Sequence, residues 1–258
     1  MASSPTDFPI HHFKSEDGLD LAYRELGEGR PLVLIHGLFS NGWTNWIRYG
    51  HAGLIAKAGF RVIMPDLRGH GMSAAPHNPA FYPPDILARD GEALLAHLGL
   101  SDYDLGGFSL GARTTLRMLV RGARPRRAIL AGMGLQGLLD TGQRTDFFRG
   151  VLTGWGDHKR GSPAWMAEAF LRTTGGDPTA MLSLLGSFVD TSREEVARLD
   201  TPTLVLSGRD DRDNGSAADL ASLMRAATLV EIAGNHMTSV LQPALGEAIQ
   251  AFLCRIDS

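Results

Sequence analysis

Short runs of apolar residues, about as long as a β-strand, recur along the chain and alternate with stretches of helical periodicity. Continuous apolar runs are typical of parallel strands that are buried on both faces. They lie at 32–35, 60–64, 127–131, 203–207 and 228–233, and a further strand begins a strand–turn–helix unit over 102–122. Helical spacing covers 51–58, 85–98, 216–225 and 243–254. This alternation predicts an α/β fold in which helices flank a mostly parallel sheet.

The N-terminal part has a different pattern. Residues 11–15 and 19–26 each alternate between apolar and polar side chains. They bracket Asp17-Gly18, a pair that favours a tight hairpin turn. We therefore expect an antiparallel edge, which brings the predicted sheet to about eight strands.

The apolar runs of strand length stop after residue 132 and begin again at 203. The intervening segment is rich in helix formers and large apolar residues, and glycines and prolines divide it. We interpret 133–200 as a small helical cap inserted into an α/β core formed by 1–132 and 201–258. The alternative is that these helices are ordinary helices of the core.

Composition narrows the range of partners. The 258 residues are 43% hydrophobic and 21% charged, and the net charge is −3. This balance gives no electrostatic basis for binding nucleic acid or an anionic membrane. Residues 1–10 lack the pattern of a signal peptide, and no apolar stretch approaches the ~18 residues of a membrane span. We therefore expect a cytoplasmic protein with a small-molecule substrate; the sequence leaves the choice between a monomer and a homodimer open.

The candidate nucleophile is Ser109, in Gly107-Phe108-Ser109-Leu110-Gly111. This pentapeptide fits G-x-S-x-G, in which the serine occupies a strained turn between a strand and a helix. Glycines are needed on both sides because side chains there would collide with the neighbouring backbone. The helix start also offers free N–H groups to a developing oxyanion.

Two further residues follow predicted parallel strands. Asp211 comes after the strand at 203–207, and His236 comes after the strand at 228–233. Loops at the carboxyl ends of parallel strands gather at one edge of a sheet, so Ser109, Asp211 and His236 can converge there. Asp210 is adjacent to Asp211 and is the alternative acid.

The chain resembles the α/β-hydrolases over nearly its whole length, and most closely the small capped serine esterases, lactonases and their perhydrolase-like relatives. The motifs that carry the resemblance, in order, are His36-Gly37, Asp66 to Ser73, Gly107 to Gly111, Gly208-Arg209-Asp210-Asp211 and Gly234-Asn235-His236. One departure is that Ala112 and Arg113 follow the elbow, where a further glycine is frequent. We expect Arg113 to pair with a carboxylate of the protein; the alternative is that it contacts the substrate.

The resemblance implies a role for each residue. Ser109 attacks an acyl carbon, His236 acts as its base, and Asp211 orients the imidazole. The family's G-x-x-D spacing favours Asp211 over Asp210. The backbone N–H groups of Leu38 and Leu110 would form the oxyanion hole.

The sequence predicts neither a metal nor a cofactor. The histidines are scattered, and the phosphate-binding motif G-x-x-x-x-G-K-[ST] is absent. Residues 132–137 fit the dinucleotide motif G-x-G-x-x-G. However, no second strand ending in an acid follows them, so we interpret them as a flexible connection to the cap.

Large apolar side chains are candidates for an apolar substrate pocket: Phe39, Trp43, Met133, Trp155, Trp165, Phe188 and Met237. We therefore predict a carboxylesterase-type serine hydrolase that cleaves a small to medium apolar ester or lactone. Two alternatives stay open. One is a ligand-sensing hydrolase-like protein with slow turnover, and the other is a C–C hydrolase, lyase or perhydrolase that uses the same triad.

Overall fold

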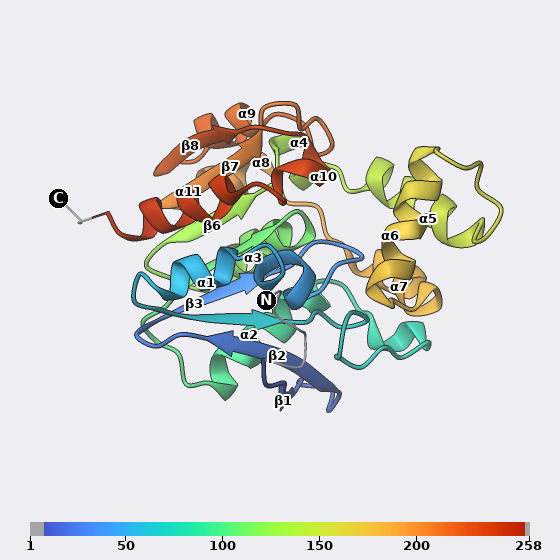
Figure 1. Cartoon of the computed structure of the whole chain (residues 1–258), viewed down its shortest axis with the longest axis horizontal. Helices are drawn as coiled ribbons and strands as arrows, with labels where there is room; N and C mark the ends of the chain where they lie inside the picture. The colour runs from blue at the N-terminus through green and yellow to red at the C-terminus, as the bar shows by residue number, and fades with distance from the viewer. Residues whose placement is uncertain (1–7, 256–258) are drawn as a thin grey trace.

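A computed structural model describes residues 8–255, and its centre is a single eight-stranded sheet (Figure 1). The strands lie in the order β1-β2-β4-β3-β5-β6-β7-β8. Their bounds are β1 His11–Lys14, β2 Asp20–Leu26, β3 Arg30–Ile35, β4 Phe60–Pro65, β5 Asp104–Phe108, β6 Ala128–Ala131, β7 Thr203–Gly208 and β8 Ala227–Ile232. The predicted strands are all present.

Strand directions confirm the predicted fold class. β1 pairs with β2, and β2 with β4, in antiparallel register, while all other neighbours in the sheet are parallel. The turn between β1 and β2 closes through Gly18, whose φ of 83° suits glycine. The hairpin therefore forms the predicted antiparallel edge.

Helices follow most strands. The α-helices are α1 His51–Ala56, α2 Ile86–His97, α3 Leu110–Arg121, α4 Leu135–Leu139, α5 Gly142–Thr153, α6 Pro163–Thr174, α7 Pro178–Leu184, α8 Arg193–Ala197, α9 Ala217–Leu223, α10 His236–Ser239 and α11 Pro243–Leu253. Short π- and 3₁₀-helical turns are η2 Trp43–Ile47, η3 Pro79–Phe81 and η4 Leu185–Ser187. Several starts carry the expected caps, such as Asp177, which accepts from Thr179 and Ala180 before Pro178 opens α7.

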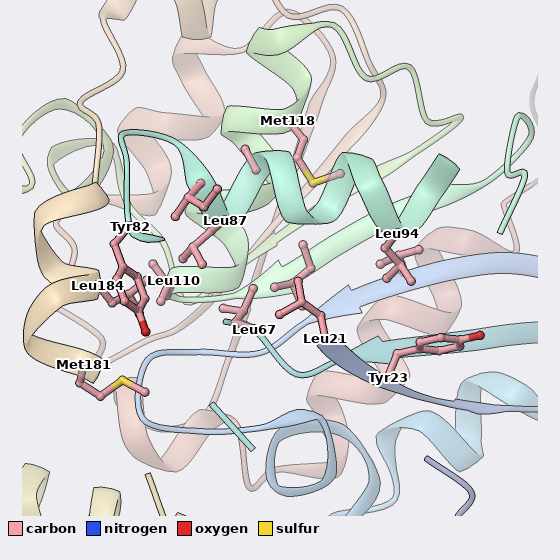
Figure 2. Close-up of a cluster of buried hydrophobic side chains, with 14 of the residues drawn as sticks. Leu21, Tyr23, Leu67, Tyr82, Leu87, Leu94, Leu110, Met118, Met181 and Leu184 are labelled. Atoms are coloured by element: carbon pink, nitrogen blue, oxygen red, sulfur yellow. The ribbon is translucent and has the colours of Figure 1, made fainter. Parts of the chain in front are cut away.

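The sheet is buried on both faces. One face is covered by α1 and α11, where Trp46, Ile55 and Ile249 pack in one cluster with β3 and β4. On the opposite face, α2 and α3 enclose a second cluster that includes Leu94 and Met118 (Figure 2). Burial on both faces explains why the parallel strands are continuous apolar runs.

Five α-helices, α4–α8, lie between β6 and β7. α5, α6 and α7 stand together beyond one end of the sheet (Figure 1). Met181 and Leu184 of α7 share a buried cluster with Leu110 of α3 (Figure 2). In contrast, Leu138 of α4 and Val196 of α8 belong to a third buried cluster, which also contains residues of β6 and β7. The segment is therefore attached to the core at both of its ends.

Across residues 8–255, no helix combines the length and apolarity that a membrane span requires.

Candidate active site

The sharp turn at Ser109 links β5 to α3. Ser109 has φ 56° and ψ −113°, a strained conformation for a residue other than glycine. A Cβ on Gly107 would lie 2.3 Å from the carbonyl carbon of Gly111, and one on Gly111 would lie 2.1 Å from the carbonyl oxygen of Ile35. Both glycines are therefore required because backbone, which cannot move aside as a side chain can, occupies the space.

His236 lies against the serine. It is the first residue of α10, whose start is capped by the Asn235 side chain. Its Nε2 is 3.0 Å from Ser109 Oγ, and its Nδ1 is 2.8 Å from Asp211 Oδ2. An ionised carboxylate can only accept, so Nδ1 carries the proton and Nε2 accepts from the serine hydroxyl. This is the tautomer that a general base needs.

Asp211 follows β7 and is buried, with 7% of its surface exposed. Burial alone would raise its pKa, but the hydrogen bonds from His236 and the Asp213 N–H together hold the pKa below its usual value. Asp210 is exposed, and its one hydrogen bond among the described residues is from its backbone N–H to the Gly234 carbonyl. The structure thus brings Asp211, and not Asp210, to the histidine.

Two backbone N–H groups beside the serine are free. Within residues 8–255, the N–H groups of Gly37, Phe39 and Ser40 each have an acceptor, whereas those of Leu38 and Leu110 have none. Leu38 and Leu110 line the same cavity as Ser109. These are the two positions that the sequence predicted as oxyanion donors.

Buried histidines hold the loop that carries Leu38. His36 Nε2 accepts from the Leu67 N–H at 2.9 Å, and His70 Nε2 accepts from the Phe39 N–H at 3.2 Å. Burial lowers the pKa of His36 to about 4, and burial together with His36 lowers that of His70 to about 3. Both rings are therefore neutral at pH 7. Asp66 braces the neighbouring turn by accepting from Gly42 and Met72.

The cavity at Ser109 is small and is lined by both polar and apolar side chains. Its volume is about 20 Å³, which is room for about one water molecule. Its walls come from the core, from α5 and from Phe188, which follows η4. The lining residues are Leu38, Ser109, Leu110, Arg113, Met133, Arg144, Thr145, Phe148, Phe188 and Asn214.

Two of the seven predicted pocket residues, Met133 and Phe188, line this cavity. Phe39 does not line it but is buried, with its ring centre 5.2 Å from that of the lining residue Phe148. Trp43 packs against Phe8 within the cluster on the α1 and α11 face of the sheet.

The remaining three predicted residues also lie outside the cavity lining. Trp155 lies beneath the guanidinium of Arg172, and Trp165 and Met237 are 37% and 52% exposed. Helical spacing identifies apolar residues in a segment but does not show which of them face the serine.

The prediction that Arg113 pairs with a carboxylate is wrong. Among the described residues, Arg113 makes no ion pair; its Nη2 donates to the Gly137 carbonyl at 2.7 Å, and its Nε has no partner. Arg144 of α5 also lines the cavity and pairs with Asp213 at 3.2 Å. Sequence reasoning missed Arg144, Thr145 and Asn214, because only the packing of α5 and the 212–216 loop brings them to the serine.

The glycine-rich stretch 132–137 packs against another loop. A Cβ on Gly134 would lie 2.3 Å from the Gly215 carbonyl oxygen, and one on Gly137 would meet the Asn214 side chain at 2.8 Å. Protein therefore fills the space that a pyrophosphate would need in a dinucleotide site.

Comparison with known proteins agrees with the fold. The family model described as the alpha/beta hydrolase family matches residues 32–245. A putative non-heme chloroperoxidase from Synechocystis sp. is 28% identical over 226 residues, which cover 75% of this chain and 78% of the relative.

Solved structures give the same result. An esterase from Thermogutta terrifontis superimposes with a TM-score of 0.75 at 22% identity, covering 95% of this chain and 98% of its own. An enol-lactonase from Burkholderia xenovorans has a TM-score of 0.72 at 24% identity, covering 95% and 100%. At these identities, the likeness shows a shared fold.

Proposed function

The chain belongs to the alpha/beta hydrolase family, and on that premise we propose that it is a serine hydrolase that cleaves a small to medium carboxylic ester or lactone. The observation that carries the proposal is the hydrogen-bonded series from Ser109 through His236 to Asp211. The free N–H groups of Leu38 and Leu110 line the same cavity. The esterase and lactonase among the structural neighbours act on this class of substrate by their names.

Acylation begins at the serine. Ser109 Oγ attacks the carbonyl carbon of the ester, and its proton passes to His236 Nε2, 3.0 Å away. The Asp211 carboxylate stabilises the imidazolium that forms and keeps the ring oriented. His236 then donates the proton to the leaving alkoxide as the tetrahedral intermediate collapses to an acyl-enzyme.

The Leu38 and Leu110 N–H groups supply the oxyanion hole. They donate to the carbonyl oxygen as negative charge develops on it, and one such donor is worth roughly 3–4 kcal/mol of transition-state stabilisation. The buried His36 and His70 keep the 37–39 loop in place, so little reorganisation is needed during the reaction. Deacylation repeats the sequence, with water as the nucleophile and His236 as its base.

Residues 133–200 act in this proposal as the cap over a core of 1–132 and 201–258. The cavity holds about one water as it stands, and α5 contributes Arg144, Thr145 and Phe148 to its wall. Displacement of α5 would admit the substrate. α4, α7 and α8 would stay in place because Leu138, Met181 and Val196 are fully buried in clusters shared with the core.

The test is a panel of esters and lactones of varied acyl length, measured with wild type and Ser109→Ala. We expect multiple turnovers on at least one substrate and a loss of at least roughly a thousandfold in the variant. Near wild-type activity in Ser109→Ala would overturn the mechanism. Absence of turnover, combined with a ligand-induced rise in Tm, would instead favour the ligand-sensing alternative.

The similarity to a putative chloroperoxidase favours a second candidate activity, perhydrolysis. Hydrogen peroxide would replace water in deacylation: one peroxide oxygen bonds to the acyl carbon, the Ser109 ester bond breaks, and a peracid leaves. The peracid would then transfer its terminal oxygen to a halide ion, which gives hypohalous acid and the free carboxylate. Peracid formation from an ester and peroxide, compared between wild type and Ser109→Ala, tests this activity directly.

A further inference from the structure

Arg113 is a buried cation without a counter-ion. It is 7% exposed, and among residues 8–255 it forms no ion pair; Asp190 acts on it without pairing with it. One hydrogen bond, to the Gly137 carbonyl, uses Nη2, while Nε is buried without a partner. Arginine is rarely buried unless it is paired, because desolvating an unpaired charge is costly.

The surroundings of Arg113 make the positive charge still less favourable. It lies in the first turn of α3, where the helix dipole disfavours a cation. Two charges from residues 133–200 act on it: the guanidinium of Arg144, which has the same sign, and the carboxylate of Asp190, which has the opposite sign and a smaller effect. Burial, followed by Arg144, lowers the pKa of Arg113 to about 10, so the side chain is still charged at neutral pH. The Gly137 carbonyl and Asp190 therefore offset only part of the cost of burying this charge, and no carboxylate of the described residues pairs with it directly.

Arg113 lines the cavity of the proposed reaction centre, and it also lines a second small cavity together with Asp85 and Arg117. Arg113 is one helical turn beyond Ser109, on the same side of α3, and both residues line the cavity. The Phe188 ring lies 5.2 Å from the guanidinium carbon and helps to hold the side chain in this position. Arg144 lines the same cavity from α5, and the centre of the Phe148 ring lies 5.0 Å from its guanidinium carbon.

Taking the proposed function as given, we propose that Arg113, assisted by Arg144, binds a carboxylate carried by the substrate. A guanidinium binds a carboxylate through two parallel hydrogen bonds, and Arg113 has donors left to make them. The substrate class is then an ester or lactone that carries a second, free carboxylate. This substrate class differs from the apolar ester or lactone that the sequence predicted, because it carries a negative charge.

The position of Arg113 limits the length of the substrate. Side chains one helical turn apart start about 5–6 Å from each other, so the carboxylate would be a few carbons from the scissile carbonyl. Monoesters of dicarboxylic acids of succinate to adipate size meet this requirement. An ester whose short alcohol part carries the carboxylate meets it equally well.

Matched esters distinguish these two sources of the carboxylate. Monomethyl glutarate is compared with methyl 4-carbamoylbutanoate, in which a neutral amide replaces the acyl-side carboxylate. 3-Acetoxypropanoate is compared with 3-acetoxypropanamide, which makes the same change on the alcohol side. We expect kcat/KM to be at least about tenfold higher for the carboxylate in one of these pairs, as for a hydrogen-bonded charge pair.

Variants of Arg113 test the residue itself. Arg113→Gln keeps a donor for the Gly137 carbonyl, and we expect it to lower kcat/KM at least about tenfold for the preferred acid ester. The amide ester should change little, and Arg113→Lys should restore part of the preference. Arg121→Gln is the matched control, because Arg121 lies on the same helix and pairs with Glu92 at the surface. If Arg113→Gln lowers kcat/KM equally for the acid ester and the amide ester, the role of Arg113 is structural and the proposal is overturned. Equal kcat/KM values of wild type for the two members of each ester pair would also overturn it.

A separate measurement keeps this proposal distinct from the proposed function. Turnover of a neutral aryl ester that is lost in Ser109→Ala, without any preference for acid esters, would overturn the carboxylate subsite alone. If no ester is turned over, calorimetry of glutarate binding to wild type and Arg113→Gln still decides the question. We expect binding that the variant weakens at least about tenfold, and absence of binding to wild type would overturn the subsite.

Discussion

The Asp211 carboxylate lies 2.8 Å from Nδ1 of His236 and fixes the proton on that nitrogen. Asp211→Asn would place an amide there, which can turn its NH₂ group toward the ring and favour the tautomer with Nε2 protonated. We expect kcat to fall by roughly 10³–10⁴ while the fold is retained. Steady-state kinetics on the preferred ester, with circular dichroism as a check of folding, measure this.

Asp210→Asn is the control for that variant, because Asp210 is exposed and contributes only backbone groups to the turn. Its kcat should stay within a few-fold of wild type. A larger loss in Asp210→Asn than in Asp211→Asn would contradict the assignment.

The sequence predicted the architecture well because each parallel strand is a short apolar run that ends at a turn. It also predicted that Ser109, Asp211 and His236 converge, since chain topology alone brings the ends of β5, β7 and β8 to one edge. The cavity wall depends instead on how α5 packs on the core. Apolar spacing could not distinguish Phe148, which lines the cavity, from Trp165, which faces solvent.

Two helical glycines are predicted to respond oppositely to alanine. In Gly111→Ala, the new Cβ would lie 2.1 Å from the Ile35 carbonyl oxygen, so β3 and α3 would have to separate. We expect a loss of about 1–3 kcal/mol in unfolding free energy, with reduced activity. In Gly150→Ala, on α5, nothing lies within 4 Å of the new Cβ, and we expect a gain of about 0.5–1 kcal/mol. Urea denaturation measures both, and a Gly111→Ala protein as stable as wild type would contradict the steric argument.

The neutral His70 predicts a pH-dependent contribution to stability. Burial, with His36, depresses its pKa from 6.5 to about 3, so the unfolded chain binds a proton that the folded chain does not. The stabilisation is therefore fully present above pH 6.5 and is lost as the pH falls below it, by up to about 1.4 kcal/mol per pH unit.

His70→Gln keeps an acceptor for the Phe39 N–H and does not titrate. We expect the advantage of wild type over this variant, in unfolding free energy, to shrink by roughly 2 kcal/mol between pH 7.5 and pH 5. Urea denaturation of both proteins at several pH values measures this difference. The contributions of the other titrating groups are the same in both proteins and therefore drop out of it. An advantage that is constant with pH would contradict a neutral, buried His70.

Arg68 anchors the turn that carries His70. Its side chain is fully buried, with Nε and Nη2 at 2.9 and 2.7 Å from the Asp90 carboxylate and Nη1 at 2.6 Å from Asp17. Arg68→Met leaves the buried Asp90 without its partner, and we expect a loss of about 3–5 kcal/mol in unfolding free energy. The double variant Arg68→Met/Asp90→Leu removes the stranded carboxylate as well and should recover at least half of that loss. Recovery separates the cost of an unpaired buried charge from the cost of lost packing, because packing alone would leave the double variant no more stable than the single one.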